Sequence, residues 1–219
     1  MRPSATAPAA SIMRAFTPAM PVAFAGVPEG DVERDGVRLD ARGVEWVDEP
    51  VRIERYDPAW PLRYAEERAA LERTIGGWVV GGIHHVGSTA VPGLDAKPTI
   101  DILVGVRDLD DARGCFAQVA ELGYLYAAYR SDEMHWFCKP NPSRRTHHLH
   151  LVPVTSPRFR DELAFRDYLR THADVAASYA TLKRRLATDF AHDREGYTAS
   201  KTEFISRMLD RAVSERGHD

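Results

Sequence analysis

Cysteine, lysine and long apolar runs are scarce in this sequence, and each scarcity narrows the class of protein. Only two of the 219 residues are cysteines, Cys115 and Cys138, which is too few for a disulfide framework. No stretch approaches the ~20 consecutive apolar residues that a membrane-spanning helix requires. We therefore expect a cytoplasmic protein with both thiols reduced and with no membrane partner.

The charge is nearly balanced, which argues against a nucleic-acid partner. The formal net charge is -3, and 44% of the residues are hydrophobic and 28% charged, as in an ordinary globular domain. Residues 1–50 contain 5 arginines and 8 acidic residues, whereas 51–219 contain 24 residues of each sign. Because basic residues are not in excess, we expect no binding to nucleic acid. We expect 1–50 to be an N-terminal extension, partly disordered, and 51–215 to form one folded domain.

Hydrophobic periodicity predicts a sheet followed by helices. Apolar and β-branched segments predict strands at 78–86, 99–106, 124–129, 134–139 and 146–153. Helical spacing and capping signals predict helices from Asp57-Pro58 to 75 and at 108–122, 157–171, 174–190 and 198–215. A short hairpin is expected around Asp35-Gly36. The expected fold class is α+β, with a sheet of about five strands and a helical C-terminal half.

The segment from His85 to Asp101 has the most specific pattern, which is strand, Gly-Ser turn, Pro-Gly turn, strand. Gly87 lets the backbone approach a ligand closely, and Ser88 and Thr89 supply hydroxyl and backbone N–H groups, so the turn is a candidate phosphate cradle. The spacing is not that of a P-loop. The alternative is a tight turn that binds nothing.

Asp101 lies within an apolar strand, where an ionised carboxylate is costly unless it is paired or bound to a metal ion. Strand alternation puts Asp101 on the same face as Thr99 and Leu103. An acid beside a Gly-Ser turn is suitably located to hold Mg²⁺ against phosphate oxygens. The alternative is a buried aspartate that caps a neighbouring turn.

Histidines gather in two short stretches, and the second stretch alternates between the faces of a strand. His148 and His150 share one face, and His147 points the other way. Together with Asp101 they suit a transition-metal site, or they serve as acid/base or phosphate-contacting groups. The alternative is a polar sheet face filled by hydrogen-bonded histidines.

Basic residues flank these motifs. Arg144 and Arg145 precede the histidine strand and are suited to bidentate contacts with a triphosphate, unless they form a solvated loop. Codon usage explains why lysine is rare but not where the lysines lie. We predict that at least two of them converge on the pocket between Gly87 and Asp101. The 29 basic residues include only four lysines, Lys97, Lys139, Lys183 and Lys201.

Several of these segments resemble the GrpB family. The resemblance covers about residues 51–212 and implies a nucleotidyltransferase-like fold with a mixed sheet. In that superfamily a Gly-Ser turn holds nucleotide phosphates, and acids on the following strand hold Mg²⁺. Leu103 stands at the second acid position of that strand, and His148 and His150 stand where a later strand carries a further acid. The matching segments are Tyr56-Asp-Pro-Ala-Trp-Pro, His85-Val-Gly-Ser-Thr-Ala-Val-Pro-Gly-Leu, Lys97-Pro-Thr-Ile-Asp-Ile, Arg145-Thr-His-His-Leu-His-Leu, Phe165-Arg-Asp-Tyr-Leu-Arg, Tyr179-Ala-Thr-Leu-Lys and Tyr197 to Lys201 and Phe204-Ile.

The resemblance implies an enzyme that transfers a nucleoside monophosphate, most simply AMP from ATP, to an unidentified small molecule or protein, with Mg²⁺ or Mn²⁺ as cofactor. The alternatives are a non-catalytic nucleotide- or phosphometabolite-binding module and a metal-dependent hydrolase. Asp101, His148 and His150 are the candidate catalytic and metal-binding residues. The candidate nucleotide-binding residues are Gly87, Ser88, Thr89, Lys97, Lys139, Arg145 and Lys201.

Overall fold

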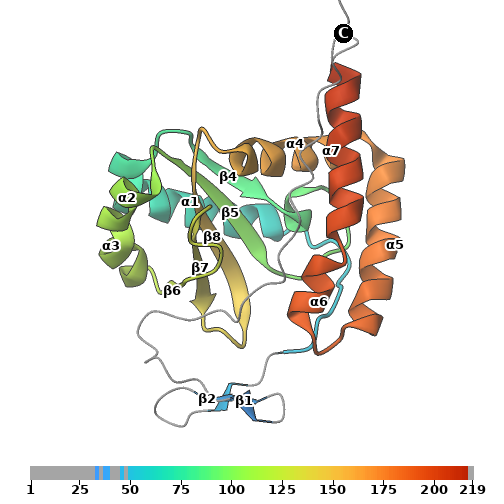
Figure 1. Cartoon of the computed structure of the whole chain (residues 1–219), viewed down its shortest axis with the longest axis horizontal. Coiled ribbons are helices and arrows are strands. Elements are labelled where there is room, and N and C mark those ends of the chain that lie inside the picture. Colours follow the sequence, from blue (N-terminus) through green and yellow to red (C-terminus); the bar gives the residue numbers. More distant parts are fainter. Residues whose placement is uncertain (1–32, 35–36, 40–44, 47–48, 217–219) are drawn as a thin grey trace, which may run out of the picture.

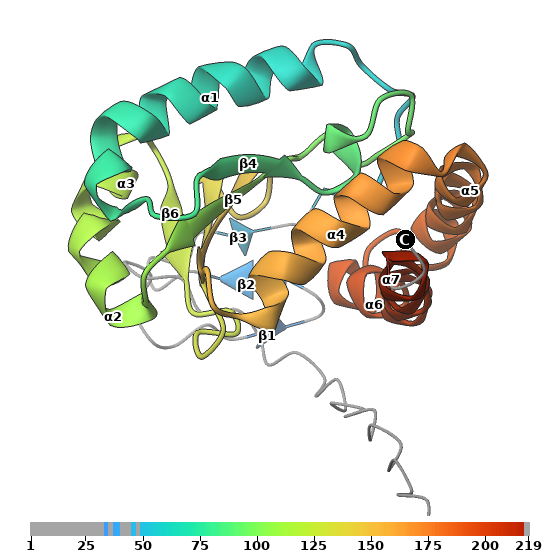
Figure 2. The ribbon, with the colours of Figure 1, turned by 90° about the horizontal axis from the view of Figure 1, so that it is seen from above.

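The computed structural model describes residues 33–34, 37–39, 45–46 and 49–216, and its body is a mixed sheet with helices on both faces (Figures 1 and 2). The sheet has five strands, which are, from one edge to the other, β4 (Ile83–Val86), β5 (Ile100–Val106), β8 (Arg145–Pro153), β7 (His135–Pro140) and β6 (Leu125–Ala127). The helices are α1 (Trp60–Ile75), α2 (Leu109–Ala112), α3 (Phe116–Glu121), α4 (Pro157–Thr171), α5 (Ala173–Asp189), α6 (Arg194–Ala199) and α7 (Thr202–Arg216). The expected α+β fold is confirmed.

The central pair of strands sets the register of the sheet. β5 and β8 run parallel, and every other pair in this sheet is antiparallel. In the parallel pair Asp101 is opposite His148, and Leu103 is opposite His150. The polar positions of two strands that are far apart in the sequence therefore meet in the middle of the sheet.

The two faces of the sheet differ in what they bury. Ile100, Ile102 and Val104 of β5 point toward α1 and join the largest apolar cluster, which also contains Leu71 and Leu149. Each such side chain contributes roughly 1.5–3 kcal/mol when it leaves water. This face therefore supplies most of the hydrophobic stabilisation of the sheet.

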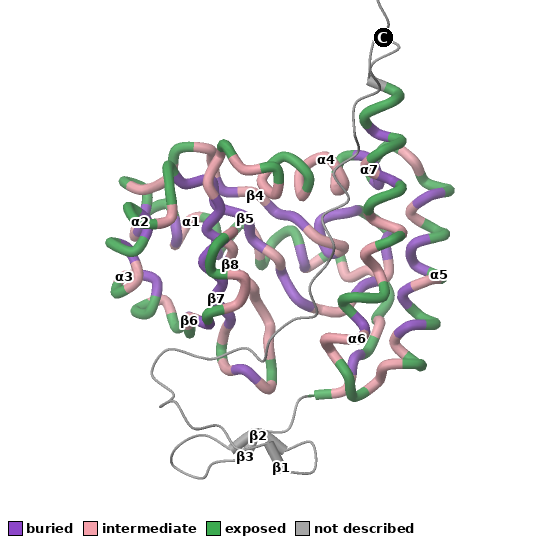
Figure 3. The backbone as a smooth tube through the Cα atoms, in the orientation of Figure 1, coloured by how far each residue is buried: buried purple, intermediate pink, exposed green. Residues whose placement is uncertain are grey.

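The opposite face of the sheet carries a smaller apolar cluster and is covered by α4. Leu103, Trp136 and Val152 pack there against Phe159 and Leu163 of α4. Figure 3 shows the buried stretches along the strands and on the helices beside them. The polar residues of β5 and β8 that share this face lie between the sheet and the helical half.

The helical half packs mainly on itself. Tyr168 and Leu169 of α4, Val175 and Tyr179 of α5 and Met208 of α7 belong to one buried cluster. The turn after β4 also contributes two apolar residues to this cluster, Val91 and Leu94. The helices are thereby attached to the turn that carries the Gly-Ser motif.

Two of the expected helices are interrupted, and the first expected strand is shorter. The stretch 108–122 divides into α2, a 3₁₀ turn at Arg113–Cys115 and α3. Gly114 in this turn packs against Trp78, where a Cβ atom would lie 3.1 Å from the indole Nε1. Trp78 itself lies in a 3₁₀ turn, so the strand begins only at Ile83. Close packing of a glycine against a large ring is a tertiary contact that periodicity does not reveal.

The stretch 198–215 is likewise two helices. α6 starts earlier than expected because the side chain of Asp193 accepts a hydrogen bond from the Gly196 N–H. The Ser200 N–H donates to the carbonyl of Gly196, so Ser200 ends α6 and does not begin the next helix. Lys201 follows at this break, and its Nζ lies 4.3 Å from the centre of the Tyr197 ring.

A small separate sheet precedes the body. Its strands are β1 (Glu33–Arg34), β2 (Val37–Leu39) and β3 (Glu45–Trp46), and β2 pairs antiparallel with each of the other two. Arg34 pairs with Val37, which is the pairing that a hairpin at Asp35-Gly36 requires, although these two turn residues are outside the described ranges. The expected partial disorder of 1–50 is not tested, because most of this segment also lies outside the described ranges. Within the described residues no helix is long and apolar enough to cross a membrane.

Candidate functional site

Asp101 and His148 form the centre of the candidate site. Oδ1 of Asp101 lies 2.9 Å from Nδ1 of His148, and both side chains are largely enclosed, with 27% and 17% of their surfaces exposed. A carboxylate oxygen can only accept, so His148 donates from Nδ1 and its Nε2 carries a lone pair. Nε2 is buried without a hydrogen-bond partner in the described part of the chain. The pair therefore presents an unused nitrogen ligand next to a carboxylate.

His150 adds a second imidazole, and a helix residue that the sequence analysis missed stands behind it. Nδ1 of His150 lies 3.4 Å from Oε2 of Glu162 on α4. Neither ring nitrogen of His150 has a hydrogen bond among the described residues. Glu162 is in turn paired with Arg158, whose Nε lies 3.0 Å from Oε1. Glu162 is thus positioned to orient His150, as outer carboxylates do at metal-binding histidines.

The donor atoms of this cluster fit a divalent metal ion. Asp101, His148 and His150 each offer one ligand atom, and no two of these atoms are more than 4.8 Å apart. Donors at about 2.2 Å from one ion are at most about 4.4 Å from each other, so shifts of a few tenths of an ångström suffice. One oxygen and two imidazoles suit Mn²⁺ or another transition metal better than Mg²⁺, which prefers oxygen ligands.

Electrostatics fix the charge states of the pair. Burial would raise the pKa of Asp101, but the hydrogen bond from His148 and the positive charges nearby outweigh it and hold that pKa below its usual value. Burial lowers the pKa of His148 to about 4, although Asp101 opposes the shift. At neutral pH the site therefore contains an ionised Asp101 and a neutral His148, which are the forms that bind metal ions.

Gly87 brings the Gly-Ser turn against the Asp101 carboxylate. Its φ of +69° is in the region that favours glycine, and a Cβ atom there would overlap Oδ2 of Asp101. Ser88 follows in a 3₁₀ turn, Ser88–Ala90, and lies beside the hydroxyl of Tyr179 on α5. The turn and the acid that the sequence analysis paired are therefore in direct contact.

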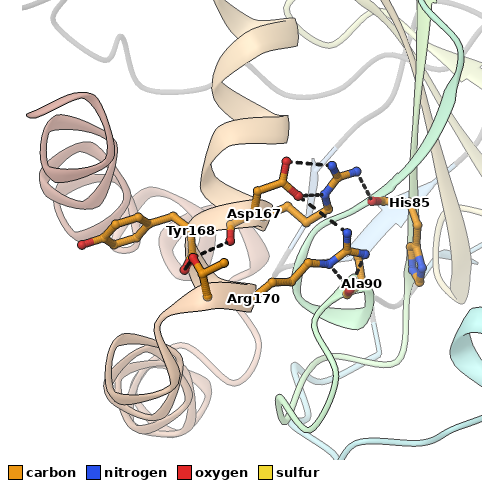
Figure 4. A network of polar contacts seen from close by, with 7 residues as sticks. His85, Ala90, Asp167, Tyr168 and Arg170 are labelled. Carbon is orange, nitrogen blue, oxygen red and sulfur yellow. Dashed lines mark hydrogen bonds and ion pairs between the residues drawn. The ribbon is translucent and has the colours of Figure 1, made fainter. Parts of the chain in front are cut away.

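Two arginines of α4 hold the turn in place (Figure 4). Arg170 donates from Nε and Nη2 to the carbonyl oxygen of Ala90, at 3.0 and 2.8 Å. Arg166 donates to the carbonyl oxygen of His85 at 3.2 Å and also pairs with Asp167. The helical half thereby positions both ends of the turn.

Thr89 does not offer its hydroxyl to a ligand, which corrects one expectation. The side chain is almost fully buried and donates to the carbonyl oxygen of Thr99 at 3.1 Å. Nε2 of His85 lies 3.0 Å from the same hydroxyl and must be the donor in that contact, because the hydroxyl has only one hydrogen. Both groups stabilise the turn internally, and the His85 ring stacks on Tyr64 with ring centres 4.7 Å apart.

Three of the four lysines lie within electrostatic reach of Asp101. The negative charge of Asp101 acts on Lys97, Lys183 and Lys201, although burial dominates and lowers the pKa of each, to about 7, 7 and 8 respectively. Lys183 has a structural role, because its Nζ donates a hydrogen bond to the carbonyl oxygen of Asp95 at 2.6 Å. Lys97 and Lys201 are the other two lysines within electrostatic reach of the acid.

Lys139 lies on the other face of the sheet and is not part of this cluster. It is the neighbour of Cys138, which pairs with His148, so strand alternation turns Lys139 toward α1. There its Nζ forms an ion pair with Glu67 and lies 4.8 Å from the centre of the Tyr124 ring. The expectation that Lys139 contacts the same ligand as Lys201 is therefore wrong.

Arg145 lies at the edge of the site. Its guanidinium is 5.3 Å from the centre of the Trp136 ring, which in turn lies 5.0 Å from the ring of His148. Lys97 and Arg145 both act on His148 electrostatically and both line a cavity of about 250 Å³. The full lining of the cavity is Glu49, Pro50, Arg52, Glu54, Lys97, Pro98, Thr99, Arg145 and Arg194.

The charged residues of α4 that contact the site, such as Glu162, recur at a regular spacing that is visible in the sequence. Arg158, Glu162, Arg166 and Arg170 recur every fourth position of α4 and so lie on one side of the helix. Such a row is normally a solvated face. Here it faces the sheet, where it contacts His150 and the turn after β4.

The comparisons with known proteins agree with this structure. The family described as GrpB protein matches residues 50–211. A UPF0157 protein of Pseudomonas aeruginosa is 40% identical over 177 residues, which cover 78% of this chain and 71% of that protein. The UPF0157 protein YqkA of Bacillus subtilis is 32% identical over 74% of this chain and 47% of its own length. The crystal structure of conserved protein GrpB from Enterococcus faecalis aligns with a TM-score of 0.68 and 31% identity, covering 75% of this chain and 99% of that one.

Proposed function

The chain belongs to the GrpB family, and we propose that it transfers a nucleoside monophosphate from a nucleoside triphosphate, most simply AMP from ATP, to a small-molecule acceptor. One observation carries the proposal. The metal-competent cluster of Asp101, His148 and His150 is in contact with the Gly87 turn and is flanked by Lys97 and Lys201. A carboxylate-bound cation beside a glycine turn and further cations is the environment that a polyphosphate requires.

Different residues of the site bind the phosphates and the divalent ion. Gly87 has no side chain to keep the phosphates from the backbone of the turn, and Ser88 supplies a hydroxyl and a backbone N–H group. Lys97, Lys201 and Arg145 neutralise the negative charge that accumulates on the phosphoryl oxygens, which is the largest contribution a preorganised site makes. Asp101 and His148, with His150, would hold a divalent ion, which supplies Lewis-acid polarisation of a phosphoryl oxygen when bound.

The transfer is a substitution at the α-phosphorus. The hydroxyl oxygen of the acceptor forms a new bond to this phosphorus while the bond from the phosphorus to the bridging oxygen of the β-phosphate breaks, and pyrophosphate leaves with that electron pair. The hydroxyl proton passes to an imidazole nitrogen. His150 is our candidate proton acceptor when it is not a ligand, because its Nδ1 lies 3.4 Å from the Glu162 carboxylate, which can orient the ring.

The experiment is a pyrophosphate-release and label-transfer assay. The full chain is mixed with each nucleoside triphosphate, labelled at the α-phosphate, with Mg²⁺ or Mn²⁺ and with a small-molecule extract as the source of acceptor. We expect pyrophosphate release with label transfer, which Asp101→Asn abolishes and Asp110→Asn, a change at a fully exposed acid, leaves unchanged. Absence of pyrophosphate with every triphosphate and both metals would sink the proposal and leave a binding module.

A metal-dependent hydrolase is the second candidate, and one observation favours it. The second acid position of β5 is Leu103, which is fully buried in the apolar cluster beneath α4, and histidines supply the remaining ligands. A single-ion site of this kind also suits the activation of water. A hydrolase would release the labelled nucleoside monophosphate as the free acid, with no label on any extract component.

A further inference from the structure

The ring of His150 is held less directly than the other two candidate metal ligands. Asp101 and His148 orient each other through a hydrogen bond of 2.9 Å, whereas neither ring nitrogen of His150 has a hydrogen-bond partner among the described residues. The His150 ring lies instead beside the Glu162 carboxylate, whose Oε2 is 3.4 Å from Nδ1. Metal-binding histidines depend on such outer carboxylates for the orientation of the ring. The position of His150 therefore depends on what holds Glu162.

Arg158 holds Glu162 from the preceding turn of α4, and its guanidinium lies between two carboxylates. Nε of Arg158 is 3.0 Å from Oε1 of Glu162, and Nη1 donates to Oε2 of Glu133 at 3.1 Å. The three side chains are mostly enclosed, with between 21% and 30% of their surfaces exposed. Partly buried ion pairs are screened less by water and salt than exposed ones. Because Oε1 of Glu162 faces Arg158, Oε2 is the oxygen that faces His150.

Glu133 belongs to the loop between β6 and β7, and this loop is fixed beside α4. Oε1 of Glu133 accepts a hydrogen bond from Nη2 of Arg130 at 2.7 Å. The backbone N–H groups of Glu133 and Met134 both donate to the carbonyl oxygen of Arg130. Met134 is buried in the apolar cluster beneath α4 together with Trp136. The loop thereby presents the Glu133 carboxylate to Arg158.

The contacts alternate in charge from the loop to the metal-competent cluster. Burial would raise the pKa of Glu162, but the charges of His150 and Arg158 outweigh it and hold that pKa below its usual value. Glu162 is therefore ionised at neutral pH. The planar guanidinium of Arg158 contacts one carboxylate through Nε and the other through Nη1, which the single ammonium of a lysine would not reproduce.

We propose that Arg158 and Glu133 are positioning residues of the metal site, which hold the Glu162 carboxylate against His150. The loop between β6 and β7 thereby contributes to metal affinity without contacting the ion. Neither residue supplies a ligand atom, because the candidate ligand atoms come from β5 and β8. This inference rests on the metal-binding part of the proposed function and not on the transfer reaction.

The first test is a titration of the full chain with Mn²⁺, in which electron paramagnetic resonance measures the free ion. It compares the wild type with Arg158→Gln and with the matched control Arg160→Gln, which removes the same charge from an exposed position of α4. Loss of a positive charge by itself should strengthen the binding of a cation, whereas loss of orientation should weaken it. We expect Arg158→Gln to bind Mn²⁺ roughly 3- to 30-fold more weakly than the wild type. Arg160→Gln should bind at least as tightly as the wild type, and unchanged or tighter binding by Arg158→Gln would overturn the proposal.

The loop is tested by a second matched pair, which does not depend on the folding of the Arg158 variant. Glu133→Gln and Asp132→Asn each remove one negative charge from the loop, and Asp132 is exposed. We expect Glu133→Gln to bind Mn²⁺ roughly 2- to 10-fold more weakly than Asp132→Asn. Equal affinity in these two variants would overturn the role of Glu133.

A double-mutant cycle separates an action through Glu162 from a general structural effect. If Arg158 acts through Glu162, Arg158→Gln should cause no further loss of Mn²⁺ affinity in a Glu162→Gln background. Losses that add in the double variant would overturn the proposal. Urea unfolding of every variant establishes that the titrated protein is folded.

Pyrophosphate release decides the transfer reaction independently of these titrations. Mn²⁺ binding that depends on Arg158, without release of pyrophosphate, would support the positioning role and refute the transfer. Release of pyrophosphate by a protein whose Mn²⁺ affinity does not depend on Arg158 would overturn the positioning role and leave the transfer in place. Absence of Mn²⁺ binding in the wild type would overturn the metal site and the positioning role together.

Discussion

Gly87 and Asp101 lie so close together that no other residue fits at position 87 without displacing the acid. An ideal Cβ atom on Gly87 would contact Oδ2, Cγ and Cβ of Asp101, and the φ of +69° is itself unfavourable for other residues. The contact joins the turn after β4 to the strand β5 that pairs with it. The position of the carboxylate therefore depends on the absence of a side chain fourteen residues earlier.

Gly87→Ala should weaken metal binding in addition to straining the backbone. We expect a loss of about 1–3 kcal/mol in the free energy of unfolding from the positive φ, and in addition weaker binding of Mn²⁺ because Asp101 must move. Gly93→Ala is the matched control, since Gly93 has a φ of +75° and nothing within 4 Å of the added Cβ. Urea unfolding and metal titration of both variants provide the measurements. Equal metal affinity in the two variants would contradict the proposed contact.

Glu162→Gln tests whether the α4 carboxylate orients His150. Removal of an outer carboxylate typically costs 10- to 100-fold in metal affinity, and we expect a loss in that range for Mn²⁺. Asp161→Asn, at the exposed neighbouring position of the same helix, should leave the affinity unchanged. Displacement of a metal-sensitive dye measures both. A drop of similar size in the two variants would indicate a general effect of charge and not an action through His150.

His85 should make stability depend on pH in the acidic range. Burial lowers its pKa to about 4 in the folded protein, whereas an unfolded histidine titrates near 6.5. Between pH 4 and 6.5 the unfolded chain binds a proton that the folded chain does not, so the free energy of unfolding falls as the pH falls through this window. The shift corresponds to about 3 kcal/mol at most.

His85→Gln should reduce that pH dependence while retaining a donor toward Thr89. His148 also titrates near 4 and contributes in the same direction, so the informative quantity is the difference between variant and wild type. Urea midpoints measured from pH 4 to 7.5 give this difference. Parallel curves for the two proteins would show that His85 is not the group responsible.

Substitution of Lys139 should affect the stability of the fold, whereas substitution of Lys201 should affect nucleotide binding. Lys139→Met leaves the Glu67 carboxylate without its buried partner, and we expect a loss of about 3 kcal/mol with nucleotide affinity unchanged. Lys201→Met removes an ammonium whose pKa burial lowers to about 8, so it should not destabilise the fold, but it should weaken nucleotide binding. Thermal unfolding and titration with a fluorescent ATP analogue measure both effects. Reduced nucleotide affinity in a stable Lys139→Met protein would contradict the placement of Lys139 on the other face.

The elements with strong local signals were predictable. β5 and β8 agree with the predicted strands to within one residue, and α4 has the predicted bounds, because alternation and the Ser156-Pro157 start are local patterns. The breaks between α2 and α3 and between α6 and α7 were not predictable. They depend on Gly114 packing against Trp78 and on Ser200 ending α6, which are contacts and caps that compete with the periodic pattern.

The sequence by itself determined which residues of each strand share a face. Period two puts His148 with His150, and Asp101 with Leu103, whatever the strands pair with. Tertiary structure decided what meets across strands and layers. The parallel register puts Asp101 opposite His148, α4 brings Glu162 to His150, and Lys139 faces Glu67 on the other side of the sheet. The cavity likewise exists only because four distant segments pack together. Local periodicity is a property of residues that are neighbours in the sequence, whereas strand register and helix docking follow from the burial of the whole core. For this reason the contacts of the site across strands and layers could be identified only in the folded chain.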